Sequence, residues 1–186
     1  MGFALAEACA ERGAEVTLVA GPVSLKTHHP AIKRIDVESA GEMYQAAMTA
    51  FPSSDAAILC AAVADYRPEN ASEQKIKRET EREMTLHLVP NPDIAASLGA
   101  IKREGQVMVG FALETNDEAT HAEGKLKRKN LDFIVLNSLR DQGAGCRCDT
   151  NKITIIDNAG GVTSYPLKTK REVACDIVNK LVTLLK

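Results

Sequence analysis

The chain has 186 residues, a length that suits one domain with a sizeable core. Its formal net charge is -2, with 45% apolar and 26% charged residues, which is ordinary for a globular protein and gives no global basic field for a nucleic-acid partner. No apolar run reaches the roughly 18 residues of a membrane helix, and five cysteines, an odd number, argue against a disulfide framework, so we expect a cytoplasmic protein.

The N-terminal part alternates predicted helices and short strands. Gly13 supplies a stop for the first helix, and Ser39 with Glu42 three residues later forms a capping box for the second. The apolar run at 55–63 is typical of a strand covered on both faces. The expected elements are a helix over 2–12, strands over 15–20 and 31–37, a helix over 39–50 and a strand over 55–63.

The second part begins with an interruption. Residues 65–70 are turn-like, and 73–82 are dense in charge without an apolar stripe, which predicts a mobile loop. The alternation then resumes, with capping boxes at Thr115 and Thr169. The expected elements are a strand over 84–89, a helix capped by Asn91 and ending near Gly105, a strand over 106–109, a helix from Thr115 to about Asn130, a strand over 132–136, a hairpin with strands at 153–157 and 162–166, and a helix from Thr169.

This order predicts a Rossmann-like, doubly wound α/β fold: a mostly parallel sheet with helices on both faces and a C-terminal β-hairpin. The chain begins in a helix with no strand before it. In such folds a first strand feeds a glycine-rich phosphate loop at the N-terminus of that helix. We therefore expect one domain, 1–186, from which this strand and loop are missing.

Ligands of open parallel sheets bind at the carboxyl ends of the strands, where three segments are candidates. Asp65 follows the strand at 55–63, Asn91–Ile94 opens a helix after the next strand, and Gly110–Thr115 holds the matching place in the next unit. Each has a structural alternative: a turn aspartate, a plain helix cap, and a core side chain at Phe111.

Two groups of cations could bind phosphate. Lys75–Arg78 lies in the predicted mobile loop, whose closure would neutralise phosphate charge and exclude water. Lys125 and Lys129 are four residues apart and share one helix face. The alternatives are a solvated face for the first group and lysines that complement a helix dipole for the second.

Taken together, these segments resemble the phosphopantothenate–cysteine ligase domain of the bifunctional coenzyme A biosynthesis protein family. The segments that carry the resemblance, in family order, are Met1–Ala4, Val16–Leu25, Cys60–Pro68, Lys75–Arg78, Asn91–Ile94, Gly110–Thr115 and Lys129–Asp132. The resemblance implies that the carboxylate of 4'-phosphopantothenate attacks the α-phosphate of CTP to give an acyl-cytidylate, from which the amine of L-cysteine displaces CMP. It implies assistance by Mg2+ or Mn2+ and no flavin in this domain.

The resemblance also implies the site residues. Lys75 would be the catalytic lid lysine that stabilises charge on the acyl-cytidylate. The implied nucleotide-binding residues are Leu59, Cys60, Ala61, Asp65, Lys75, Pro92, Asp93, Ile94, Ala95, Phe111, Lys125 and Lys129. Metal ligands are not assigned. A homodimer formed through residues 137–166 is implied, as is a flavin-dependent decarboxylase fused to or associated with the domain. Without the first strand and loop, we expect reduced activity of this chain alone.

Two other functions remain open from the residues. An NAD(P)-dependent Rossmann oxidoreductase would need a glycine fingerprint and an acidic ribose-binding residue, and neither is visible. A non-catalytic nucleotide-binding fragment would bind CTP without releasing pyrophosphate. The residues themselves do not distinguish CTP from ATP.

Overall fold

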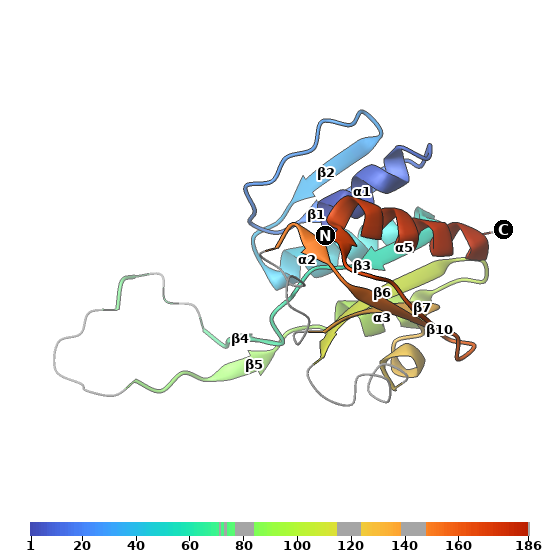
Figure 1. Ribbon diagram of the computed structural model, residues 1–186. Helices are drawn as coiled ribbons and strands as arrows, with labels where there is room; N and C mark the ends of the chain where they lie inside the picture. Colours follow the sequence, from blue (N-terminus) through green and yellow to red (C-terminus); the bar gives the residue numbers. More distant parts are fainter. Residues whose placement is uncertain (71, 73, 77–83, 115–123, 139–147, 186) are drawn as a thin grey trace.

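The computed structural model describes residues 1–70, 72, 74–76, 84–114, 124–138 and 148–185 (Figure 1). Residues 124–128 are helical as well. The elements in chain order are α1 (Gly2–Ala10), β1 (Val16–Ala20), β2 (Ile32–Asp36), α2 (Ala40–Ala50), a 3-10 turn η1 (Phe51–Ser53), β3 (Ala56–Leu59), β4 (Tyr66–Pro68), β5 (Leu88–Pro90), α3 (Ile94–Ile101), β6 (Val107–Glu114), β7 (Phe133–Ser138), β8 (Thr150–Asn151), β9 (Ile153–Asp157), β10 (Val162–Ser164), β11 (Lys168–Thr169) and α5 (Lys170–Leu184).

A five-stranded sheet of order β10-β9-β7-β6-β3 forms the centre of the domain. Strands β3, β6 and β7 are parallel, whereas β9 runs antiparallel to β7 and forms a hairpin with β10. Helices α1 and α5 pack on one face of this sheet and α3 on the other. The structure therefore confirms an α/β fold with a mostly parallel central sheet and a C-terminal hairpin.

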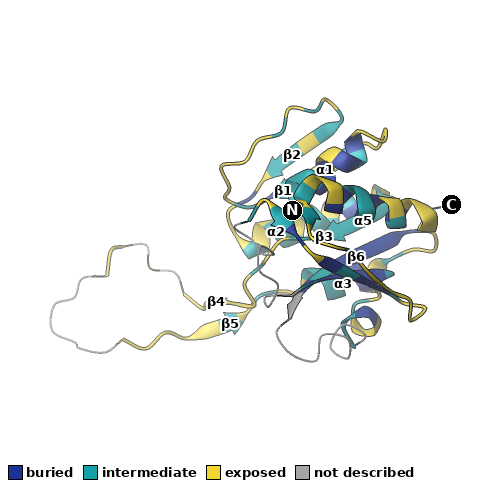
Figure 2. Cartoon of the chain, viewed as in Figure 1, coloured by how far each residue is buried: buried dark blue, intermediate teal, exposed yellow. Residues whose placement is uncertain are grey.

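The core lies on both faces of the two central strands, β6 and β7. Val109 and Val135 are fully buried against side chains of α1 and α5. We call this group of buried side chains the first core cluster. Met108 and Ile134 are buried against α3 and form the second core cluster. Because successive side chains of a strand point to opposite faces, a strand that is buried on both sides has a continuous apolar run, and Figure 2 shows buried residues along β6.

Strand β3 departs from the prediction. The run at 55–63 was expected to be one strand covered on both faces, but β3 ends at Leu59 and all four of its residues are only half-buried. Within the described residues, β3 pairs with β6 and not with β1, which forms a separate parallel pair with β2. The edge of β3 is thus unpaired on one side, which explains its exposure.

Strands β4 and β5 form a two-stranded antiparallel ribbon that projects from the body of the domain (Figure 1). Two predictions are wrong here: the turn expected at 65–70 contains β4, and the strand expected at 84–89 is reduced to Leu88–Pro90. Pairing of Pro68 with Leu88 sets the register. Much of the loop predicted at 73–82 lies outside the described residues.

The helix ends follow the sequence closely at two places and depart from it at a third. The capping boxes at Ser39 and Thr169 are both formed. Helix α3, however, is capped by Asp93 rather than Asn91, and it ends at Ile101, short of Gly105. The predicted cap at Thr115 lies outside the described residues.

Strand β6 is longer than the predicted strand at 106–109. It continues through Glu114 because β7 offers backbone partners as far as Ser138. Residues 110–114 of the candidate segment, which were expected to follow the strand, are therefore part of β6 and have a β-strand backbone.

A short turn at Lys129–Asp132 connects the helical residues 124–128 to β7 and is fastened on two sides. Asn130 adopts a left-handed conformation (φ 51°) and its amide donates to the carbonyl of Gly99 in α3 (3.0 Å). The ammonium of Lys102 donates to the carbonyl of Asn130 (3.1 Å) and to the carboxylate of Asp132 (2.6 Å). Asp132 also accepts from the backbone N–H of Met108 in β6 (2.6 Å), so one carboxylate links α3, this turn and the sheet.

Replacing Asp132 with alanine should destabilise the fold, because it leaves the Lys102 ammonium and the Met108 N–H without their acceptor. We expect the free energy of unfolding to fall by about 2–4 kcal/mol, measured by urea denaturation. Asp36→Ala is the matched control, since the Asp36 side chain is 68% exposed in its ion pair with Arg34 and should contribute about 1 kcal/mol or less. Equal losses in the two variants would contradict the linking role of Asp132.

Candidate functional site

Asn91 joins the segment after β3 to the segment after β5. Its backbone N–H donates to the carbonyl of Asp65 (2.8 Å), and its side-chain amide donates to the carbonyl of Ala64 (2.9 Å). The guanidinium of Arg67 donates to the carbonyl of Pro90 (2.8 Å) and to the side chain of Asn91 (3.3 Å). These contacts bring Asp65 beside the start of α3. Asn91 is therefore a link between strand ends, a role that its predicted capping function missed.

Asp93 and Lys129 form an ion pair at the N-terminus of α3. The Lys129 ammonium lies 3.1 Å from Oδ1 and 3.0 Å from Oδ2 of Asp93, and Oδ1 also accepts from the N–H of Ala96 (3.0 Å). Burial would raise the pKa of Asp93, but hydrogen bonds from Ala96 and Lys129 outweigh it and lower the pKa. Two residues 36 positions apart in the sequence, both predicted to bind nucleotide, are thus brought together.

Gly99 sets how closely α3 approaches Lys129. A Cβ atom on Gly99 would lie 2.2 Å from the carbonyl oxygen of Lys129, and that oxygen belongs to backbone, which cannot swing aside. Glycine is unfavourable inside a helix, so its presence in the middle of α3 was a usable signal of close packing. Sequence reasoning missed it.

Gly99→Ala should therefore push α3 away from the turn and lower the free energy of unfolding by about 1–3 kcal/mol, measured by urea denaturation. Gly41→Ala is the control. Gly41 lies near the start of α2, where an added Cβ would be 3.9 Å from its nearest neighbour, so alanine there should be neutral or stabilising by up to about 1 kcal/mol. A Gly99→Ala protein as stable as Gly41→Ala would show that this contact is not close in solution.

The predicted residues at the ends of β3 and β6 divide between the two faces of the sheet. Leu59 pairs with Gly110 and, with Ile94, packs against the second core cluster. Cys60 and Phe111 pack against the first core cluster, and both are half-buried. Phe111 thus fits its core alternative. Ala61, by contrast, is exposed.

The two predicted lysines outside the ion pair lie in different surroundings. Lys125 is half-buried in the helical residues 124–128, and its carbonyl accepts from the N–H of Lys129 (3.0 Å), so the two lysines follow each other by one helical turn. Lys75 is exposed and lies in the sequence between β4 and β5, the two strands of the projecting ribbon (Figure 1). The structure does not bring Lys75 to the other predicted residues.

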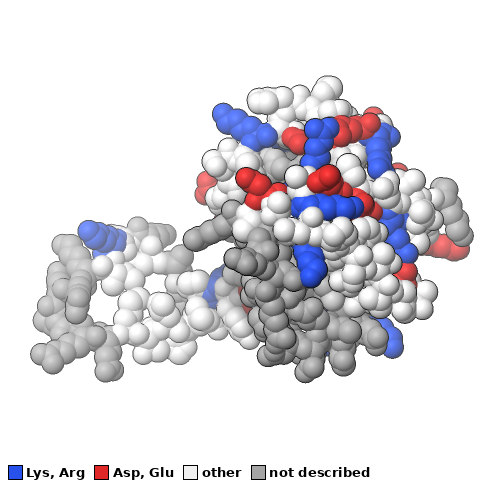
Figure 3. Space-filling model, viewed as in Figure 1, with Lys and Arg blue, Asp and Glu red and all other residues white. Residues whose placement is uncertain are grey.

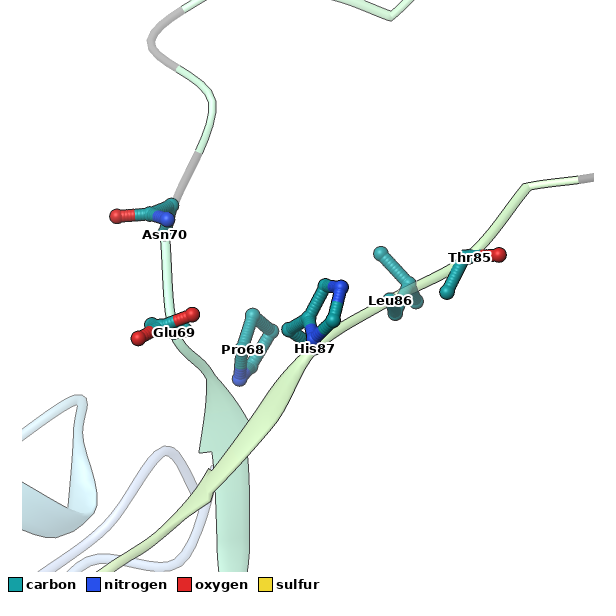
Figure 4. Close-up of a pocket in the computed structure, with 6 residues that line it drawn as sticks. All are labelled: Pro68, Glu69, Asn70, Thr85, Leu86 and His87. Carbon is teal, nitrogen blue, oxygen red and sulfur yellow. The ribbon is translucent and has the colours of Figure 1, made fainter.

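A pocket of about 180 Å³ lies where the two sides of the projecting ribbon separate, and it contains none of the predicted residues (Figure 4). Its volume is below the roughly 300 Å³ typical of small-molecule sites. The residues that line it are Pro68, Glu69, Asn70, Thr85, Leu86 and His87. We therefore place the candidate site at the strand ends and α3, and not at this pocket.

The surface charges and the candidate metal ligands of the described residues were compared with this site. On the face drawn in Figure 3, the visible Lys and Arg side chains are interspersed with Asp and Glu. Within the part of the chain that the structure describes, no three His, Cys, Asp or Glu side chains gather closely enough to hold a metal ion, and no helix is long and apolar enough to cross a membrane.

The fold and the strand-end site define a Rossmann-like α/β domain with its candidate site between the carboxyl ends of parallel strands and the start of the following helix. The family model described as "DNA/pantothenate metabolism flavoprotein C-terminal domain" matches residues 1–185. The chain belongs to this family.

Curated relatives match the whole chain but are about twice as long. The chain is 45% identical to the coenzyme A biosynthesis bifunctional protein CoaBC of Vibrio parahaemolyticus, matching 100% of this chain and 46% of that protein. It is 56% identical to a protein named cysteine/cysteine sulfinic acid decarboxylase from an unknown prokaryotic organism, matching 100% of this chain and 51% of that protein. The chain thus spans about half the length of these relatives.

Solved structures agree on the fold. The C-terminal domain of a coenzyme A biosynthesis bifunctional protein CoaBC is 34% identical with a TM-score of 0.81, covering 98% of this chain and 81% of that one. A Cab2 mutant in complex with phosphopantothenate-cysteine is 16% identical with a TM-score of 0.60, covering 83% of this chain and 54% of that one, a similarity that supports the fold alone.

Proposed function

We propose that this chain is a phosphopantothenate–cysteine ligase domain that forms an amide between 4'-phosphopantothenate and L-cysteine at the expense of CTP, in coenzyme A biosynthesis. Its family membership and its 45% identity to a coenzyme A biosynthesis protein support this proposal. The observation that carries it is the ion pair of Asp93 and Lys129 at the start of α3, next to Asn91, whose N–H donates to the backbone carbonyl of Asp65.

The arrangement at the start of α3 suits a nucleoside triphosphate. The ammonium of Lys129 is a donor for phosphate oxygens, and the N-terminus of α3 beside it favours anions. Lys125, one helical turn before Lys129, adds a second cation from the same helix. The small residues after β3, Cys60 and Ala61, let a planar base approach the backbone closely.

The reaction has two steps in this proposal. A carboxylate oxygen of 4'-phosphopantothenate bonds to the α-phosphorus of CTP, and the bond to pyrophosphate breaks. The amine of L-cysteine then bonds to the acyl carbon, loses a proton, and CMP leaves with the electrons of the acyl–oxygen bond. Both steps develop negative charge on oxygen, which positioned cations stabilise.

Lys75 is the cation proposed to act at the acyl-cytidylate. It lies outside the cluster at α3, so the role requires the segment between β4 and β5 to fold over the strand ends once substrates bind. Closure of a loop on this scale is a common step that excludes water from a reactive intermediate.

A divalent cation, Mg2+ or Mn2+, would be held by one carboxylate of this chain together with the substrate phosphates. Mg2+ is commonly held by one or two carboxylates together with substrate phosphates and water. Asp65, exposed directly before β4, would supply one carboxylate to a metal that arrives with the nucleotide. The metal would supply neutralisation of triphosphate charge.

The proposal is tested by measuring pyrophosphate release from CTP in the presence of 4'-phosphopantothenate, L-cysteine and Mg2+. We expect pyrophosphate to be released and the amide to form, and we expect amide formation to require both 4'-phosphopantothenate and L-cysteine. CTP binding without release would favour the non-catalytic nucleotide-binding alternative. A thermal stabilisation by NAD(P) and not by CTP would favour the oxidoreductase.

Lys75→Gln should abolish most of the turnover while leaving CTP affinity within a few fold, because the lysine acts on the intermediate. We expect at least a hundredfold fall in kcat, the scale seen when one charge-stabilising donor is removed. Lys33→Gln, on the exposed side of β2, is the control and should retain full activity. Full turnover by Lys75→Gln would exclude the lid assignment.

A homodimer through 137–166 belongs to the same proposal, as does association with a flavin-dependent decarboxylase. In the described part of that segment, β10 forms the edge of the sheet and Val162 is 62% exposed. Unpaired edges of this kind can join across a twofold axis.

Val162→Asp should therefore shift the molar mass measured by light scattering from dimer to monomer. Leu88→Asp on the ribbon, where Leu88 is 55% exposed, is the matched control and should leave the dimer intact. Dissociation by Leu88→Asp alone would move the interface to the ribbon, and a monomeric parent protein would remove the dimer from the proposal.

A further inference from the structure

Asp93 occupies two roles at once in the candidate site. As the cap of α3, its Oδ1 accepts from the N–H of Ala96 (3.0 Å). Both of its oxygens also face the ammonium of Lys129, at 3.0 and 3.1 Å. The capping hydrogen bond fixes the carboxylate relative to α3, so the lysine that pairs with it is held at the start of that helix.

Lys129, which forms the ion pair with Asp93, is equally constrained. The backbone of Lys129 lies against Gly99, and the next residue, Asn130, donates to the carbonyl of Gly99 (3.0 Å). Main chain and side chain of Lys129 are thus both held by α3. A free lysine side chain carries considerable rotamer entropy, and the ion pair restricts it before any ligand is present.

We propose that Asp93 is a positioning residue: it acts on nucleotide affinity through Lys129, by holding that ammonium at the start of α3, rather than by contacting base or sugar itself. The proposal rests on the function proposed above, in which Lys129 binds phosphate. It differs from the role implied by the family resemblance, where Asp93 lines the nucleotide pocket directly.

Asp93→Asn separates the two roles. Asparagine is as good a helix cap as aspartate, so the bond from Ala96 persists while the charge that attracts Lys129 is lost. Asp93→Ala removes both the cap and the charge. The fold of α3 should therefore be unaffected in Asp93→Asn and weakened in Asp93→Ala, which thermal unfolding will show.

The test is a double-mutant cycle on CTP affinity, measured by calorimetry with Asp93→Asn, Lys129→Gln and the double variant. The side chains of Lys129 and Asp93 are 28% and 50% exposed, so the pair has the strength of a partly exposed ion pair, and we expect Asp93→Asn to weaken CTP binding about twofold to fivefold. In the Lys129→Gln background the same substitution should change affinity by less than about 1.5-fold, because its target is gone. CMP, which lacks the outer phosphates, should bind all four proteins about equally.

Asp176→Asn is the matched control, because Asp176 lies in α5, on the opposite face of the sheet from α3, and pairs at 2.7 Å with Lys168, whose side chain is 30% exposed against 28% for Lys129. It should leave CTP affinity unchanged. Equal losses for Asp93→Asn with and without Lys129, or CTP binding by Asp93→Asn as tight as or tighter than the parent, would overturn the positioning role. Failure of the parent protein to bind CTP would instead reject the proposed function.

Discussion

The hydrogen bonds that fasten the Lys129–Asp132 turn hold the candidate site in place. Asn130 ties the turn to α3, and Asp132 ties it both to Lys102 and to the N–H of Met108 in the central strand. A carboxylate that is largely removed from water requires such donors. Removing one of the bonded groups leaves the others without a hydrogen-bond partner. Because Lys129 immediately precedes these residues, the position of its ammonium follows from how this turn is attached.

Local rules predicted much of the fold. The capping boxes at Ser39 and Thr169 and the glycine-rich hairpin before β10 depend on a few neighbouring residues, and all formed as expected. The failures depend on distant partners. Strand β6 is longer than its local pattern because β7 extends alongside it, and β3 is shorter and more exposed because one edge lacks a neighbour within the described residues.

The candidate site shows the same division between features that local sequence predicts and contacts between residues far apart in the sequence. The family resemblance implied Asp65, Asp93 and Lys129, but it did not predict the pairing of Asp93 with Lys129, which joins residues 36 apart in the sequence. The link made by Asn91 was read as a cap, since a local pattern cannot show that its partners are Ala64 and Asp65. Lys75 is the opposite case: its proposed role needs a rearrangement of the projecting segment.

In the proposed function, the start of α3 and Lys129 together bind the phosphates of a nucleotide. The most direct measurement is a crystal structure of the protein with CTP and Mg2+. We expect phosphate oxygens within hydrogen-bonding distance of the Lys129 ammonium and the first N–H groups of α3, with the base beside the residues that follow β3. Nucleotide bound elsewhere, such as in the pocket of the ribbon, with the Asp93–Lys129 pair undisturbed, would contradict it.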